Sequence, residues 1–281
     1  MIKDTVYNVF LGWGLPTEFI LEMYAVKAFS LPAFTGYVSR GIFLNMLRWV
    51  NPNLSEKYHK PNVMKPYSVT PLYFKRTKGK EAGEGKCLLD PNYPCTMKIR
   101  LLRDEDTIHI LNYFRGKNTV TVYGETLQIS SISVQTKSYE ELEKESKPTK
   151  KFRLYFKTPT YLASLGSGYH ELFPDPIKVF PNLMRLWDQC TTTKKFGKEK
   201  LREYKDWLTK NMGVTEYKLK TKLAKMGKKK TTGFVGWVTY EMRTTDEWSK
   251  ITHTLAKYAE YSNIGGNRTG GFGVTITKIK V

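Results

Sequence analysis

The order in which the apolar pattern changes along the chain constrains the fold more than any other feature. Alternating apolar residues, typical of strands, and apolar residues three or four apart, typical of helices, follow one another as β-α-β-β-α-β in residues 5–137. The order then repeats. We expect strands at 5–12, 67–74, 97–102, 120–134, 152–158, 214–223, 232–242 and 273–281, and helices at 31–50, 104–115, 180–187, 198–208 and 246–261.

This element order predicts an α+β protein of two tandem ferredoxin-like (RRM-like) βαββαβ domains. The N-terminal domain is expected over residues 1–137 and the C-terminal domain, with a glycine-rich loop, over residues 152–281. Residues 138–151 are polar and contain Pro148, so we interpret them as a linker with room for a short helix. Residues 51–64 are interpreted as a polar loop, and residues 75–86 as an exposed hairpin tip.

The charge balance points to a polyanionic partner. The chain of 281 residues has 46 Lys and Arg against 26 Asp and Glu, which leaves a formal net charge of +20. Apolar stretches are too short to cross a bilayer and no signal peptide is apparent, so we expect a cytoplasmic protein that does not bind membranes. Neither the three cysteines nor the four histidines have metal-ligand spacing, and no metal or cofactor is expected.

A glycine-rich segment, NIGGNRTGGFG at residues 263–273, separates the last helix from the last strand. Glycine lets a backbone approach a phosphate closely, successive N–H groups can surround an anion, and Arg268 could add a bidentate contact. An ordinary flexible loop is the alternative. The candidate phosphate-binding residues are Gly265, Gly266, Asn267, Arg268, Gly270 and Gly271.

Residues 194–230 form the most basic segment of the chain. Lys218, Lys220 and Lys222 alternate, so on a strand they project from one face, and Lys228 and Lys229 belong to the turn that follows. Such a row suits a phosphate backbone. A solvated, lysine-rich surface without a ligand is the alternative.

Several of these features together resemble the CRISPR-associated repeat-processing endoribonucleases of the RAMP superfamily. The C-terminal signature of that family is a glycine, an apolar residue and a glycine, repeated after five positions, and Asn263-Ile264-Gly265 and Gly271-Phe272-Gly273 occupy it here. Asn263 replaces the first glycine, and asparagine is the residue that best tolerates a positive φ after glycine. The strand at residues 152–158 and the segment Thr232–Trp237 extend the resemblance.

The resemblance also implies a catalytic site. In family members with a His-Lys-Tyr site, the histidine lies in the loop after the first helix and the lysine six residues later, and His59 and Lys65 have this spacing. The tyrosine comes from the preceding helix, where Leu44 aligns, so Tyr37 or Tyr58 would have to replace it. A histidine can serve as general acid or base, and a lysine can stabilise charge on the transition state.

The family likeness therefore implies a metal-independent endoribonuclease that cleaves CRISPR repeat RNA through the 2′-OH to give guide RNAs, as a monomer or a homodimer. The rival hypothesis is a non-catalytic RNA-binding RAMP subunit of a CRISPR effector complex, with effector proteins as partners. His59 discriminates between them, because a pure binder has no need of a histidine there. A general single-strand-binding or RNA-modifying protein would explain the charge but not both motifs.

Overall fold

The computed structural model describes residues 16–61, 63–75, 85–163, 168–192, 194–226 and 229–279. The chain divides into two compact units. Unit 1 comprises Met1–Thr136 with Thr269–Gly271, and unit 2 comprises Lys137–Arg268 with Phe272–Val281. The tip of the glycine-rich segment thus packs with the N-terminal unit, although both flanks belong to the C-terminal one. Within the described residues, no helix is long and apolar enough to cross a membrane.

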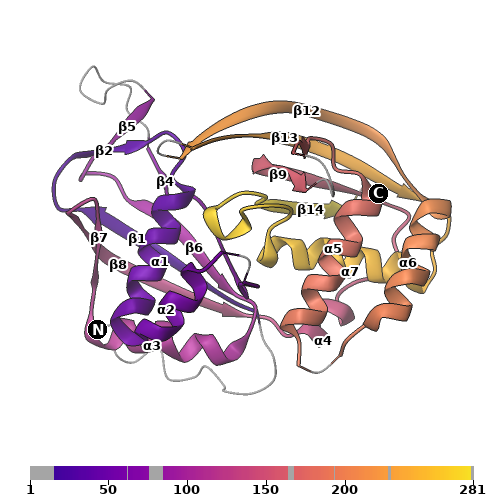
Figure 1. Ribbon diagram of the computed structural model, residues 1–281, viewed down its shortest axis with the longest axis horizontal. Coiled ribbons are helices and arrows are strands. Elements are labelled where there is room, and N and C mark those ends of the chain that lie inside the picture. The colour runs from indigo at the N-terminus through magenta and orange to yellow at the C-terminus, as the bar shows by residue number, and fades with distance from the viewer. Residues whose placement is uncertain are drawn as a thin grey trace. The chain divides into compact units, whose positions relative to one another are not determined.

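Unit 1 is an antiparallel sheet covered by helices (Figure 1). Its sheet order is β3-β6-β1-β8-β7, with β4 also pairing with β6. If β1, β3, β6 and β8 are taken as the four principal strands, this order is 2-3-1-4, which is the ferredoxin-like order. The strands are β1 (Thr17–Ala25), β3 (Tyr67–Val69), β4 (Tyr73–Phe74), β6 (Cys95–Leu101), β7 (Thr119–Val122) and β8 (Glu125–Thr136); a separate pair is formed by β2 (Phe29–Pro32) and β5 (Lys86–Leu89). The helices are α1 (Gly36–Val50), α2 (Pro52–His59), the 3-10 turn η2 (Asp104–Asp106) and α3 (Thr107–Gly116).

Two expectations for unit 1 need comment. The strand expected at residues 5–12 lies outside the described residues, and the first strand observed is β1, whose Phe19, Leu21 and Met23 are fully buried. The expectation of a loop over residues 51–64 is wrong in its first part, because residues 52–59 form α2. Asn51 ends α1 and also caps α2: its side-chain oxygen accepts a hydrogen bond from the Leu54 N–H at 3.0 Å.

Unit 2 repeats the arrangement with sheet order β12-β13-β9-β14, again 2-3-1-4. Phe152, Leu154 and Phe156 of β9 are buried on one face, where Phe152 contacts Phe180 of α5 and His253 of α7. The elements are α4 (Tyr139–Lys144), β9 (Lys151–Thr160), the pair β10 (Leu162–Ala163) and β11 (His170–Glu171), α5 (Pro176–Cys190), α6 (Gly197–Asn211), β12 (Met212–Met226), β13 (Lys229–Met242), α7 (Glu247–Ser262), the 3-10 turn η3 (Arg268–Gly270) and β14 (Thr275–Ile279).

Side-chain caps explain where α4, α5 and α7 of unit 2 begin. Ser138 and Glu141 form a reciprocal capping box that starts α4 inside the stretch interpreted as a linker. Asp175 caps α5 ahead of Pro176, and Asp246 caps α7 through the Ser249 N–H at 2.9 Å. The prediction of two tandem ferredoxin-like units is confirmed.

Candidate nucleic-acid interface

The position of His59 is set by the way α2 folds back along α1. Ser55 Oγ donates a 2.8 Å hydrogen bond to the carbonyl oxygen of Leu44, which ties the middle of α2 to the middle of α1. His59 lies one turn beyond Ser55, as the last residue of α2, and its side chain is exposed. The structure therefore presents the imidazole to solvent at a helix end.

Tyr58 has a different environment from its neighbour. Its side chain is 3% exposed, and its hydroxyl donates a 2.6 Å hydrogen bond to Oδ2 of Asp106, which is 4% exposed. Burial, followed by the nearby Asp106 carboxylate, raises the pKa of the Tyr58 phenol well above its usual value. The phenol thus acts as a fixed donor that attaches the last turn of α2 to η2.

The start of α1 is packed against the tip of the glycine-rich segment within unit 1. A Cβ on Gly36 would lie 2.0 Å from the carbonyl oxygen of Gly270, so a larger residue does not fit there. The ring of half-buried Tyr37 lies beside Gly270. A Cβ added to Gly270 would be 3.3 Å from Cε2 of that ring. Gly271 has a φ of +77° and packs on Gly36 and Pro71. Of the two candidate tyrosines, Tyr37 and Tyr58, Tyr37 is therefore the one that lies beside Gly270.

The rest of the loop is shaped by backbone conformations that favour glycine or asparagine. Asn263 has a φ of +59°, Gly265 of +81°, Asn267 of +52° and Gly273 of +68°. A Cβ on Gly273 would lie 1.8 Å from the carbonyl oxygen of Ile264. The Asn263 side chain donates to the carbonyl oxygen of Arg268 at 3.0 Å, and the Ile264 N–H donates to the Gly273 carbonyl at 2.8 Å. The segment is a closed loop with internal hydrogen bonds.

Tyr161, which the sequence patterns did not single out, forms the floor under this loop. Its carbonyl oxygen accepts a 2.9 Å hydrogen bond from the Gly266 N–H, and a Cβ on Gly266 would lie 2.2 Å from its ring. His170 stacks on the same ring, with centroids 4.0 Å apart. Tyr161 directly follows β9 but lies three residues beyond the strand expected at 152–158, so the sequence carried no signal for this role.

The two remaining cations of the predicted site are half-buried. Lys65 lies just before β3 and Arg268 opens η3, and each already has an interaction partner in the structure. Gly265, Gly266 and Asn267 are partly exposed, whereas Gly270 and Gly271 are buried. A phosphate could therefore reach residues 265–268, while Gly270 and Gly271 contribute through packing.

The lysine row lies on the edge strand of unit 2. Lys218, Lys220 and Lys222 of β12 pair with residues 237, 235 and 233 of β13, so they share one face, and all three are exposed. Lys229 begins β13 and is also exposed; Lys228 lies outside the described residues. Beyond Phe234, which pairs with Thr160, the hairpin extends past the end of β9.

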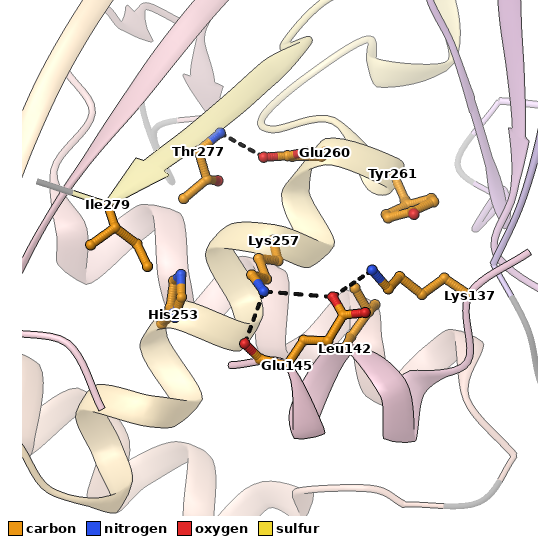
Figure 2. A pocket seen from close by; sticks show the side chains of 9 residues that line it. All are labelled: Lys137, Leu142, Glu145, His253, Lys257, Glu260, Tyr261, Thr277 and Ile279. Carbon is orange, nitrogen blue, oxygen red and sulfur yellow. Dashed lines mark hydrogen bonds and ion pairs between the residues drawn. The ribbon is translucent and has the colours of Figure 1, made fainter. Parts of the chain in front are cut away.

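A cavity of about 290 Å³ in unit 2, between α4, α7 and β14, is the second place where charged groups converge (Figure 2). The positive charge of its two lysines is balanced by two carboxylates, because Lys137 and Lys257 both pair with Glu145 and Glu260 also lines the cavity. Its histidine, His253, is 1% exposed, and burial, followed by the charge of Lys257, lowers its pKa. This cavity therefore has little capacity to attract a polyanion.

No group of three or more His, Cys, Asp or Glu side chains in the described ranges could hold a metal ion. The three cysteines are free thiols, two of them buried.

The fold and this loop define a class of protein with two ferredoxin-like units and a glycine-rich loop, of which residues 269–271 pack beside α1 within unit 1. Residues 154–275, which include the loop, match the family model of the CRISPR-associated endoribonuclease Cas6. The resemblance to repeat-processing endoribonucleases that the sequence indicated is thereby confirmed for residues 154–275. No curated protein matches the sequence.

Solved structures extend the likeness of fold to 94% of the chain. Cas6 from Thermus thermophilus is similar with a TM-score of 0.69 and 19% identity, covering 94% of this chain and 98% of that one. The product complex of the same protein gives a TM-score of 0.76 at 19% identity, covering 94% and 100%. The product complex of a second Cas6 gives 0.70 at 20% identity, covering 94% and 99%.

Proposed function

We propose that this chain is an endoribonuclease that cleaves CRISPR repeat RNA to release guide RNAs. The observation that carries the proposal is the match of residues 154–275 to the Cas6 endoribonuclease family, since that segment contains the glycine-rich loop with its positive-φ residues. The net charge of +20 and the exposed lysines of β12 support a polyanionic substrate.

The proposed chemistry is attack of the ribose 2′-oxygen on the adjacent phosphorus. A base removes the 2′-OH proton, the new O2′–P bond forms as the P–O5′ bond breaks, and an acid protonates the leaving 5′-oxygen. The products are a 2′,3′-cyclic phosphate and a 5′-hydroxyl. A metal is not needed if side chains move the protons and cations stabilise the phosphate.

In this scheme His59 is the general acid or base, because it is the exposed imidazole at the end of α2. Lys65 stabilises the negative charge that develops on the phosphate, and Arg268 with the partly exposed Gly265 and Asn267 positions the phosphate. Tyr37 is the third group, because it is partly exposed and lies beside Gly270. Tyr58 is instead the anchor of α2, since its phenol is buried and bonded to Asp106.

The test is single-turnover cleavage of labelled repeat RNA in EDTA. We expect cutting to persist without metal, and a 2′-deoxy substitution upstream of the scissile phosphate to stop cutting while leaving binding nearly unchanged. His59→Ala should slow cleavage about 10²-fold or more with little loss of RNA affinity. Lys57→Ala is the matched control, because Lys57 is an exposed cation on the same turn of α2 and has no role in the scheme.

The outcomes separate the mechanism from its rivals. Full activity of His59→Ala would remove this histidine from the site, and loss of cutting in EDTA would refute the metal-independent route. A wild-type protein that binds repeat RNA tightly but never cuts it would favour the non-catalytic RAMP subunit.

A further inference from the structure

The sheet of unit 2 has one face that its helices do not cover. Along β9, Phe152, Leu154 and Phe156 point into the core with α5 and α7, so Arg153, Tyr155 and Lys157 lie on the opposite face. These three are half-buried or exposed. We call this surface the open face of unit 2; Figure 1 shows the four strands from which it is built.

Strand register places two aromatic residues side by side at the centre of this open face. Trp237 of β13 pairs directly with Tyr155 of β9, and Tyr155 pairs in turn with Ile276 of β14. Lys218 of β12 is opposite Trp237, so one row across the sheet reads Lys218, Trp237, Tyr155, Ile276. Both aromatic side chains keep part of their surface exposed.

A row of cations flanks the aromatic pair. The Arg153 guanidinium lies 3.6 Å from the ring centroid of Trp237, where it is held by hydrogen bonds to Thr239 at 3.0 Å and to Glu216 at 2.8 Å. Lys278 Nζ lies 5.7 Å from the ring centroid of Tyr155. The exposed lysines of β12 continue the positive charge to the sheet edge: Lys218, Lys220 and Lys222.

Aromatic rings and a fixed guanidinium plane are the groups on which unpaired bases stack, and neighbouring cations hold the phosphates. In the four-stranded RNA-recognition sheet, such aromatics stand on the central strands. Tyr155 and Trp237 occupy the two central strands of the 2-3-1-4 sheet. Lysines alone would bind any polyanion. The paired aromatic rings favour a nucleic acid whose bases are unpaired and exposed.

We propose that the open face of unit 2 is a base-stacking platform for a single-stranded segment of RNA, with Tyr155, Trp237 and the Arg153 plane as its stacking groups. The platform shares no residue with the proposed cleavage site. It rests on the proposed function only in that RNA is the polyanion that the protein binds. It requires no chemistry from His59.

Binding of a short single strand tests this platform separately from cleavage. The probe is labelled oligouridine of about ten nucleotides, compared with an abasic strand of the same length and charge, by fluorescence anisotropy. We expect the wild-type protein to prefer the strand with bases. Tyr155→Leu should weaken oligouridine binding about fivefold or more while changing abasic binding little, so that the preference falls.

Two further variants make the result specific. Tyr217→Leu is the matched control, because Tyr217 is a more exposed tyrosine that pairs with Val238 and so lies on the opposite face of the same sheet. It should leave the preference unchanged. Trp237→Phe, which keeps a ring, should retain most of the preference that Trp237→Leu loses, provided that circular dichroism shows both variants folded.

An equal affinity for the two strands in wild type would refute the platform, leaving only electrostatic attraction at this face. A preference that survives Tyr155→Leu in a folded protein, or that disappears equally in Tyr217→Leu, would also refute it. If the platform exists but repeat RNA is never cut, the endonuclease proposal alone fails.

Discussion

Removing the Tyr58 hydroxyl tests whether this residue is an anchor or a catalytic group. In Tyr58→Phe the buried Asp106 carboxylate loses the donor that lies 2.6 Å away. A hydrogen bond to a charged group contributes about 1.5–3 kcal/mol, and the buried charge is left without this partner, so we expect unit 1 to lose about 2–3 kcal/mol near pH 7.

The pH dependence of this loss follows from the carboxyl group. Burial raises the pKa of Asp106, and the hydrogen bond from Tyr58 opposes that rise. Without the phenol the folded-state pKa is higher still, so the native protein takes up a proton at a higher pH than the unfolded chain does. The variant's loss in free energy of unfolding is therefore complete at pH values above the Asp106 pKa of the folded variant. The loss shrinks as the pH falls through that pKa.

The assay is urea unfolding followed by circular dichroism, near pH 7 and near pH 4.5, for wild type and variant. Tyr113→Phe is the matched control, because its hydroxyl donates at 2.7 Å to the neutral carbonyl of Thr119 in the same unit. That variant should lose about 1 kcal/mol at both pH values. A Tyr58→Phe loss that does not shrink with acid would refute the reasoning, and a fully stable variant that no longer cleaves RNA would make Tyr58 catalytic.

Three other outcomes are expected. Gly273→Ala should destabilise the protein by about 1–3 kcal/mol in thermal melts, because of its positive φ and the nearby Ile264 carbonyl, whereas Gly213→Ala, which meets nothing within 4 Å, should not. Burial lowers the pKa of His253, so below about pH 6.5 only the unfolded chain protonates it and the wild-type free energy of unfolding falls with pH. His253→Gln should make this fall with pH smaller. Charge reversal on β12 should weaken RNA binding and reduce its salt dependence by about 0.7 log unit per lost phosphate contact, measured by anisotropy at several salt concentrations; the reversed residues are Lys218, Lys220 and Lys222.

The sequence could predict the elements whose signals are local. The alternation in residues 214–223 and 232–242 predicted β12 and β13, and the spacing of Trp248, Ile251 and Leu255 predicted α7. Helix α2 is not predicted, because Asn51-Pro52 also indicates the end of the helix expected over residues 31–50. The same two residues start a helix, with asparagine as the cap and proline in the first turn.

The candidate site could be predicted only in part, because its supports are distant in sequence. The glycine pattern identified the loop, but nothing near residue 266 indicates that Tyr161 lies beneath it. Nor does the sequence indicate that the Gly270 carbonyl packs against Gly36, where a side chain would not fit. Likewise, Tyr58 and Asp106 are 48 residues apart, so the hydrogen bond that distinguishes an anchor from a catalytic phenol has no sequence signal.

The lysines of β12 also affect whether copies of this chain can pair through their sheet edges. In the sheet order of unit 2, β12 is a terminal strand of 15 residues, and such an edge offers unpaired N–H and C=O groups to any other strand. Charged side chains along an edge oppose that pairing. Glutamate at these positions would keep the repulsion between copies, whereas alanine would remove it. The lysine row thus protects the free protein from aggregation through this edge.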